Sequence, residues 1–208
     1  MLLSFDSPRN VPIPYNMLVS DREQLAQMLR TRSVRHGQFT LVSGQTSEWY
    51  IDAKLTTCTA SAMPLVGRLF LEKMHLRGWV PDAVGGLPMG ADAIAAAIAH
   101  QSVATSSGHA IDSFVIRKET KQHGTKRFLE GLIDPVGKSV VVLDDVCTTG
   151  GSTILAIDRA RESGLVILGA ICLVDREMGA EHNIEVNHKC PFDRVFRFVE
   201  LVDNGLTN

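Results

Sequence analysis

Apolar residues along this chain follow two patterns, short unbroken runs and segments with helical spacing. Residues 140–143 form an unbroken apolar run of three valines and a leucine, which is typical of a parallel strand buried on both faces. Residues 154–162, which follow after a turn, have apolar positions at helical spacing. Residues 21–32 have the same spacing after Ser20, a residue that caps helices, so a helix is predicted to begin the ordered body.

The other apolar segments predict further strands and helices in alternation over most of the chain. Helices are predicted at residues 62–77 and 91–101, and strands at residues 82–85, 113–116, 166–174 and 195–199. Strand-like runs at residues 39–42 and 49–52 flank a turn-forming segment and predict a hairpin or small flap. We therefore expect an α/β fold with right-handed βαβ units, in which helices flank a mostly parallel central sheet and a small N-terminal flap is added.

Composition agrees with one globular domain over residues 1–208, of which residues 1–20 are expected to form a loose arm. Hydrophobic residues make up 45% and charged residues 21%, which is ordinary globular usage. A net charge of -2 and a pI of about 6.4 argue against a nucleic-acid partner, which needs a basic face. No signal-peptide pattern and no apolar run of about 20 residues occurs, so we expect no membrane partner and a cytoplasmic location. The four cysteines are scattered and suggest neither zinc nor disulfides.

Two adjacent carboxylates, Asp144 and Asp145, follow the buried strand and precede a hydroxyl- and glycine-rich turn. The free N–H groups at residues 149–153 and the positive end of the helix dipole favour a phosphate there. Gly151 stands where a nucleotide triphosphatase loop has its lysine. A ribose 5-phosphate suits this pattern, because its vicinal hydroxyls donate to carboxylates while its phosphate lies on the turn.

Cationic residues gather in a second segment, which follows the strand predicted at residues 113–116. Arg117, Lys118, Lys121 and His123 precede Gly124 without any apolar periodicity, which predicts a mobile basic loop. Cations that close over a leaving pyrophosphate would stabilise its developing charge and exclude water. On composition alone, a solvated basic surface loop is an equal alternative.

The turn after the buried strand, with residues 141–153, resembles the phosphoribosyl-pyrophosphate motif of type I phosphoribosyltransferases. The order Arg-Lys-Glu-x-Lys-x-His-Gly at residues 117–124 closely resembles the catalytic loop of orotate phosphoribosyltransferases. Residues 37–54 are similar to that family's N-terminal flap, residues 84–92 to its second glycine loop, and residues 173–180 to the strand end that carries its orotate-binding arginine. These segments occur in the family's order.

The resemblance implies a type I phosphoribosyltransferase-like fold with an N-terminal hood, and transfer of ribose 5-phosphate from 5-phosphoribosyl 1-pyrophosphate (PRPP) to orotate in pyrimidine biosynthesis. It implies Mg²⁺ bound mainly through PRPP rather than by protein ligands, and a homodimer with shared active sites. Lys121, His123, Asp144 and Asp145 would be catalytic, and Thr148, Arg176 and Tyr50 would contact orotate. The PRPP-binding residues would be Arg117, Lys118, Lys121, His123, Asp144, Asp145, Val146, Cys147, Thr148, Thr149, Gly150, Gly151 and Ser152.

The sequence departs from the family pattern at three positions, because Val42 and Met89 stand where some members have lysine and Asp92 stands where proline is often seen. Lys54 could supply part of that charge, or could be an ordinary solvated surface residue. Cys147 is better explained as a packing residue than as a nucleophile. Two other functions stay open, a related enzyme acting on a purine or uracil and a non-catalytic regulator that senses nucleotides on the same fold.

Overall fold

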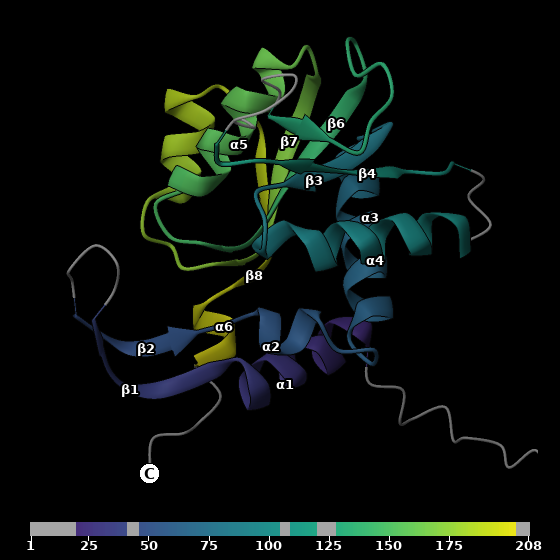
Figure 1. The fold of residues 1–208 in the computed structure, drawn as a ribbon. Helices are drawn as coiled ribbons and strands as arrows, with labels where there is room; N and C mark the ends of the chain where they lie inside the picture. Colours follow the sequence, from purple (N-terminus) through teal and green to yellow (C-terminus); the bar gives the residue numbers. More distant parts are fainter. Residues whose placement is uncertain (1–19, 41–45, 105–108, 120–127, 203–208) are drawn as a thin grey trace, which may run out of the picture.

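The computed structural model describes residues 20–40, 46–104, 109–119 and 128–202. A six-stranded sheet in the order β5-β4-β3-β6-β7-β8 forms its centre, and every neighbouring pair is parallel except β4 with β5 (Figure 1). This confirms the predicted mostly parallel α/β sheet. The strands are β3 (Ala83–Gly86), β4 (Asp112–Ile116), β5 (Leu129–Glu130), β6 (Ser139–Cys147), β7 (Val166–Asp175) and β8 (Phe192–Arg197).

Helices cover both faces of the sheet. Helices α3 (Met63–Leu76) and α4 (Gly90–Ala104) lie on one side, and α5 (Gly151–Glu162) with the π-helix η2 (His182–Asn187) lies on the other (Figure 1). Side chains of β6 divide between two hydrophobic clusters, since Val141 and Leu143 face the α3 and α4 side while Val140 and Val142 face α5. The unbroken apolar run is therefore buried on both faces, as its pattern predicted.

A smaller layer, which we call the hood, lies against one end of the sheet (Figure 1). It contains an antiparallel pair of strands, β1 (Val34–Thr40) and β2 (Thr46–Ile51), with the helices α1 (Asp21–Arg32), α2 (Lys54–Thr57) and α6 (Val199–Val202). Arg22 of α1 pairs with Glu200 of α6, so segments from opposite ends of the described chain hold the hood together.

Several element predictions are confirmed and some need correction. Helix α1 begins where expected, and the Ser20 hydroxyl accepts a hydrogen bond from the Glu23 N–H at 3.2 Å. The first flap strand begins at Val34, five residues before the prediction, because residues 34–36 also pair with residues 49–51, ahead of a register shift between His36 and Phe39. The short elements α2, β5, η2 and α6 were not predicted, since periodicity is too weak a signal in segments of two to six residues.

Strands β3 and β6 are neighbours in the sheet, and the connections that follow them run in opposite directions. This arrangement determines where a ligand can bind. From β3 the chain passes through α4 to β4 on one side, whereas from β6 it passes through α5 to β7 on the other. Neighbouring strands whose connections diverge leave a crevice beyond their carboxyl ends. Strand β3 ends at Gly86 opposite Leu143, while β6 continues to Cys147, so the last residues of β6 extend past β3.

Gly85 offers a test of this packing, because a Cβ atom there would lie 2.0 Å from the Phe114 carbonyl oxygen of β4. Gly85→Ala is expected to lower the free energy of unfolding by about 3 kcal/mol or more, since neither backbone can move aside in a buried sheet. The control is Gly78→Ala, where φ is +68° but no atom lies within 4 Å, and a cost of about 1 kcal/mol is expected from backbone strain alone. Chemical denaturation measures both, and equal costs would contradict the close approach of β3 and β4.

Candidate active site

The acid pair at the end of β6 is the centre of the candidate site. Asp144 accepts a hydrogen bond from the Thr153 hydroxyl at 2.7 Å and another from the Asp145 N–H at 3.0 Å. Burial is the main cause that raises the pKa of Asp144 to about 6; the Thr153 hydrogen bond opposes this rise and the neighbouring charge of Asp145 adds to it. One carboxylate oxygen of Asp144 therefore holds Thr153 near the start of α5. This role of Thr153 was not predicted from the sequence.

Asp145 is held beside the crevice with 13% of its side chain exposed. Its Oδ1 atom accepts the Val146 N–H at 2.9 Å, and its Oδ2 atom lies 3.5 Å from the Lys54 ammonium. Lys54 also pairs with Asp52 at 2.9 Å, and this hydrogen bond raises the pKa of the lysine. Lys54 therefore links the hood to the acid pair, although 40% of its side chain stays exposed.

The glycine loop that follows β3 approaches the same carboxylates. A Cβ atom at Gly90 would lie 2.5 Å from Asp145 Oδ1 and 3.4 Å from Asp144 Oδ1, so only glycine fits there without a shift. Met89, one of the two positions where some relatives have lysine, is 72% exposed. The backbone of Gly90 therefore packs directly against the acid pair beyond the carboxyl ends of β3 and β6.

The loop after β6 presents backbone N–H groups at the start of α5. Gly150 is the N-cap of α5 with a φ of +84°, and as a glycine it places no side chain over the free N–H groups. The loop is supported from behind by η2, where Ile184 would lie 3.1 Å from a Cβ at Gly150 and Asn183 donates to the Thr149 carbonyl at 2.9 Å. Thr149, Gly151 and Ser152 are exposed. This geometry suits an anion such as a phosphate.

Val146 and Cys147 complete the end of β6 in different environments. Val146 is half-buried, whereas Cys147 is 1% exposed with its sulfur 3.0 Å from the Thr153 hydroxyl. All four cysteines lie in the described part of the chain, and none forms a disulfide. The packing role expected of Cys147 agrees with this burial.

Arg176 lies just beyond β7 and reaches the hood. Its guanidinium donates to the Ser47 hydroxyl at 3.0 Å and to the Trp49 carbonyl at 3.2 Å, and it lies 5.0 Å from the Phe198 ring centre. Burial lowers the pKa of Arg176, which nevertheless stays charged. Tyr50 alternates with Trp49 along β2 and so belongs to the other face of the strand, where its ring packs against Phe39 at 5.4 Å.

The predicted basic loop is described only at its start. Arg117 follows β4, pairs with Glu130 of β5 at 3.4 Å, and donates its backbone N–H to the Phe128 carbonyl at 2.8 Å. Lys118 is exposed. Lys121 and His123 lie outside the described residues, as do Gly124 and Val42.

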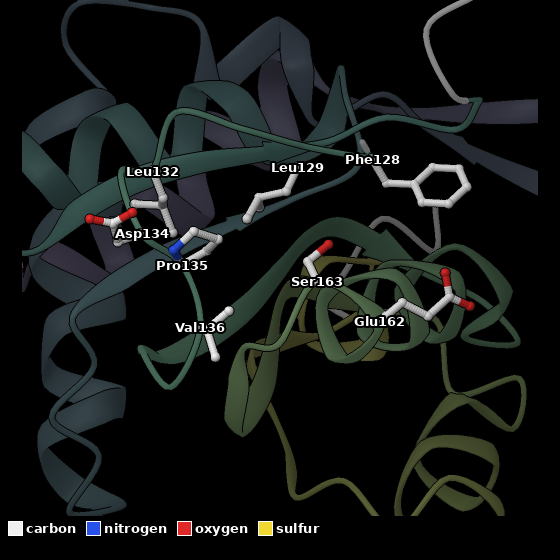
Figure 2. Close-up of a pocket in the computed structure, with 8 residues that line it drawn as sticks. All are labelled: Phe128, Leu129, Leu132, Asp134, Pro135, Val136, Glu162 and Ser163. Carbon is white, nitrogen blue, oxygen red and sulfur yellow. The ribbon is translucent and has the colours of Figure 1, made fainter. Parts of the chain in front are cut away.

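One pocket of about 650 Å³ lies apart from this crevice. Figure 2 shows it between the segment that leads from β5 to β6 and the end of α5. It contains none of the predicted site residues, and its carboxylates, Asp134 and Glu162, are unsuited to binding a phosphate. Its lining consists of Phe128, Leu129, Leu132, Asp134, Pro135, Val136, Glu162 and Ser163.

The described residues contain neither a cluster of metal ligands nor a membrane-spanning helix. No group of three or more histidine, cysteine, aspartate or glutamate side chains in this part of the chain could hold a metal ion. Among the same residues, no helix has both the length and the apolar character needed to span a bilayer.

Comparisons with known proteins give the class to which this fold and site belong. A family model described as the phosphoribosyl transferase domain matches residues 61–199, which run from the start of α3 to the beginning of α6 and include the acid pair and its loop. The class is therefore that of phosphoribosyltransferases.

Relatives and solved structures narrow this class. The orotate phosphoribosyltransferase of Aquifex aeolicus is 42% identical over 189 residues, which cover 89% of this chain and all of the relative. That of Corynebacterium glutamicum (strain R) is 42% identical over 80% of this chain and 86% of the relative. The Mycobacterium tuberculosis orotate phosphoribosyltransferase in complex with PRPP superposes with a TM-score of 0.73 at 34% identity, covering 88% of this chain and 99% of that one. The chain belongs to the orotate phosphoribosyltransferase family.

The pKa of Asp144 can be measured directly by carbon NMR of its carboxyl group. We expect a value of about 6, and a higher one in Thr153→Val, because the hydroxyl stabilises the charged form. Since the folded pKa lies above the ordinary value of 3.8, this group's contribution to stability is greatest below pH 4 and is lost as pH rises through 6. Asp82, whose pKa is lowered by hydrogen bonds from Ser139, is an internal control. Titration of Asp144 near 4 would contradict the buried geometry.

Proposed function

We propose that the chain transfers ribose 5-phosphate from PRPP to orotate, giving orotidine 5′-monophosphate and pyrophosphate in pyrimidine biosynthesis. The observation that carries this proposal is the acid pair, which lies at the crevice between β3 and β6 beside the uncapped start of α5. Membership in the orotate phosphoribosyltransferase family supports the same reaction.

The sugar phosphate would occupy the crevice with its charge at the loop. The 5-phosphate would accept hydrogen bonds from the backbone and hydroxyl groups of residues 148–152, where the α5 dipole adds positive potential. The ribose hydroxyls would donate to Asp144 and Asp145. A neutral diol between the phosphate and the acids avoids direct repulsion.

Magnesium is the proposed cofactor, bound mainly through the diphosphate. Asp144 and Asp145 are half-buried residues whose carboxylate oxygens are hard donors of the kind that suit this ion, directly or through water. These two residues would therefore hold the diphosphate-bound ion near the ribose. When bound there, the ion would supply positive charge to offset the charge that builds up on the departing pyrophosphate.

The base would bind between β7 and the hood. Arg176 offers a permanently charged, planar guanidinium that fits a carboxylate, which orotate carries and uracil, adenine and hypoxanthine lack. The Thr148 hydroxyl and the Tyr50 ring are proposed to contact orotate as well, and the contact by Tyr50 would require an approach to the outer face of β2.

The reaction needs no covalent link to the protein. The bond between ribose C1 and the pyrophosphate oxygen breaks, C1 gains oxocarbenium character, and an orotate nitrogen attacks it with inversion, while the proton of that nitrogen passes to the departing pyrophosphate. Arg117, Lys118, Lys121 and His123 are proposed to meet the diphosphate, because pyrophosphate departs with its bonding electrons and needs cations around it. Lys121 is proposed to matter most for rate.

The assembly and location are proposed from the family resemblance. A homodimer would allow the loop that carries Lys121 to reach the neighbouring site, and no nucleic acid or membrane would take part. A cytoplasmic location is supported by the four unpaired cysteines, because disulfides are rare in reducing compartments.

An ultraviolet assay tests the reaction and its specificity. With Mg²⁺ and PRPP present, orotate is expected to be consumed, whereas uracil, adenine and hypoxanthine are not. In Arg176→Met, kcat/KM for orotate should fall at least about 100-fold, because a charge-assisted bidentate contact is lost. Turnover of a purine alone would overturn the specificity, and no turnover of any base would favour a nucleotide-sensing regulator.

A mixed dimer tests the shared site. Homodimers of Lys121→Ala should keep their fold but lose most of kcat, and homodimers of Arg176→Ala should lose orotate binding. If the loop crosses between subunits, a dimer with one chain of each kind has one intact site and about half of wild-type activity. A mixed dimer as inactive as its parents would show that each loop serves its own chain.

A further inference from the structure

The proposed mechanism leaves one buried ion pair unused, and it adjoins Arg176. Asp175 is only 1% exposed, and its Oδ2 atom lies 2.9 Å from Nη1 of Arg194 on the neighbouring strand β8. The other guanidinium nitrogen of Arg194 pairs with Glu181 at 2.6 Å. A buried ion pair adds little stability compared with apolar side chains of the same size, so a role in geometry deserves consideration.

The second oxygen of Asp175 shapes the turn that carries Arg176. Asp175 Oδ1 accepts the Glu177 N–H at 2.8 Å, across a turn in which Glu177 adopts a φ of +57°. The backbone is held on both sides as well, since the Arg176 N–H donates to Cys147 at 2.8 Å and the Phe198 N–H donates to Asp175 at 2.7 Å. The carboxylate thus ties Asp175 to the Glu177 N–H across Arg176, and backbone hydrogen bonds hold the same turn.

The Arg176 side chain depends on this turn for its direction. Its Nη2 atom meets Ser47 and Trp49 of the hood, while its Nε atom is buried with no hydrogen-bond partner. The aim of the guanidinium is therefore set by the backbone from which it projects and by the Phe198 ring that it overlies. A small rotation of the turn would move the guanidinium by an ångström or more, which is enough to weaken a bidentate contact.

We propose that Asp175 and Arg194 are positioning residues, whose ion pair locks the turn and aims Arg176 at the carboxylate of the base. This inference rests on the proposed function for the identity of the base, but the positioning itself does not. Arg194 fixes Asp175, Asp175 fixes the Glu177 N–H, and the turn fixes Arg176.

The test uses Asp175→Asn and Arg194→Met. Asparagine has the same shape as aspartate but cannot accept hydrogen bonds from both Arg194 and the Glu177 N–H. This variant also keeps the test valid if Arg194→Met does not fold. The control is Arg77→Met, which removes the 2.9 Å pair with Asp193, the neighbour of Arg194 on the same strand but facing α3. All chains are compared with wild type by circular dichroism.

Two measurements decide the outcome. In the two test variants, KM for orotate should rise at least 10-fold while KM for PRPP stays within about 2-fold, and Arg77→Met should leave both unchanged. Hydrogen exchange at Arg176 Nε–H, followed by NMR without substrate, should become at least 10-fold faster in the test variants only, because the turn no longer holds this atom in its buried position.

A double-mutant cycle separates positioning from a general loss of stability. In an Arg176→Met background, Asp175→Asn should not raise KM for orotate further, since its effect passes through Arg176. The proposal would be overturned by any of three results. These are equal rises in KM for orotate and for PRPP, effects of Asp175→Asn and Arg176→Met that multiply in the double variant, and unchanged exchange of the Arg176 Nε–H. If wild type consumed no orotate, the proposed function would fail, while the exchange measurement would still decide whether Asp175 and Arg194 hold Arg176.

Discussion

The site depends on one constraint, which is that strand β6 must be both a buried central strand and the carrier of two charges. Residues 140–143 are packed on both faces and leave the strand no freedom of register. The strand then extends past the end of β3, so Asp144 and Asp145 emerge where the core stops and the crevice begins. The Gly90 loop, the start of α5 and the hood all meet at this point.

Charge balance around this point explains the neighbouring residues. The acids repel each other and lose hydration by burial, which the Thr153 hydroxyl and the Lys54 ammonium partly offset. A phosphate would be repelled by the same acids, and it is the helix dipole and the backbone N–H groups of the loop that favour it. The strand thus offers hydrogen-bond acceptors for a diol, whereas the adjoining loop offers hydrogen-bond donors for an anion.

Much of this arrangement could be predicted from the sequence because its signals are local. The Ser20 cap located α1, the apolar run located β6, and the hydroxyl- and glycine-rich turn after it located the loop at the start of α5. What stayed hidden joins distant residues, namely Thr153 with Asp144, Lys54 with Asp145, and Arg194 with Asp175. The spacing of apolar residues cannot identify such pairs, because they form only once the sheet is assembled. The roles of Lys121 and His123 stay predictions, since neither residue is described.

The ends of the sheet affect how the protein behaves at high concentration. One edge is closed by β5, an antiparallel strand of two residues that offers few open backbone groups to another chain. The other edge is β8, which carries Asp193, Arg194 and Arg197 among its six residues. A short edge and a charged edge are both poor templates for strand addition, so the sheet architecture itself disfavours aggregation through its margins.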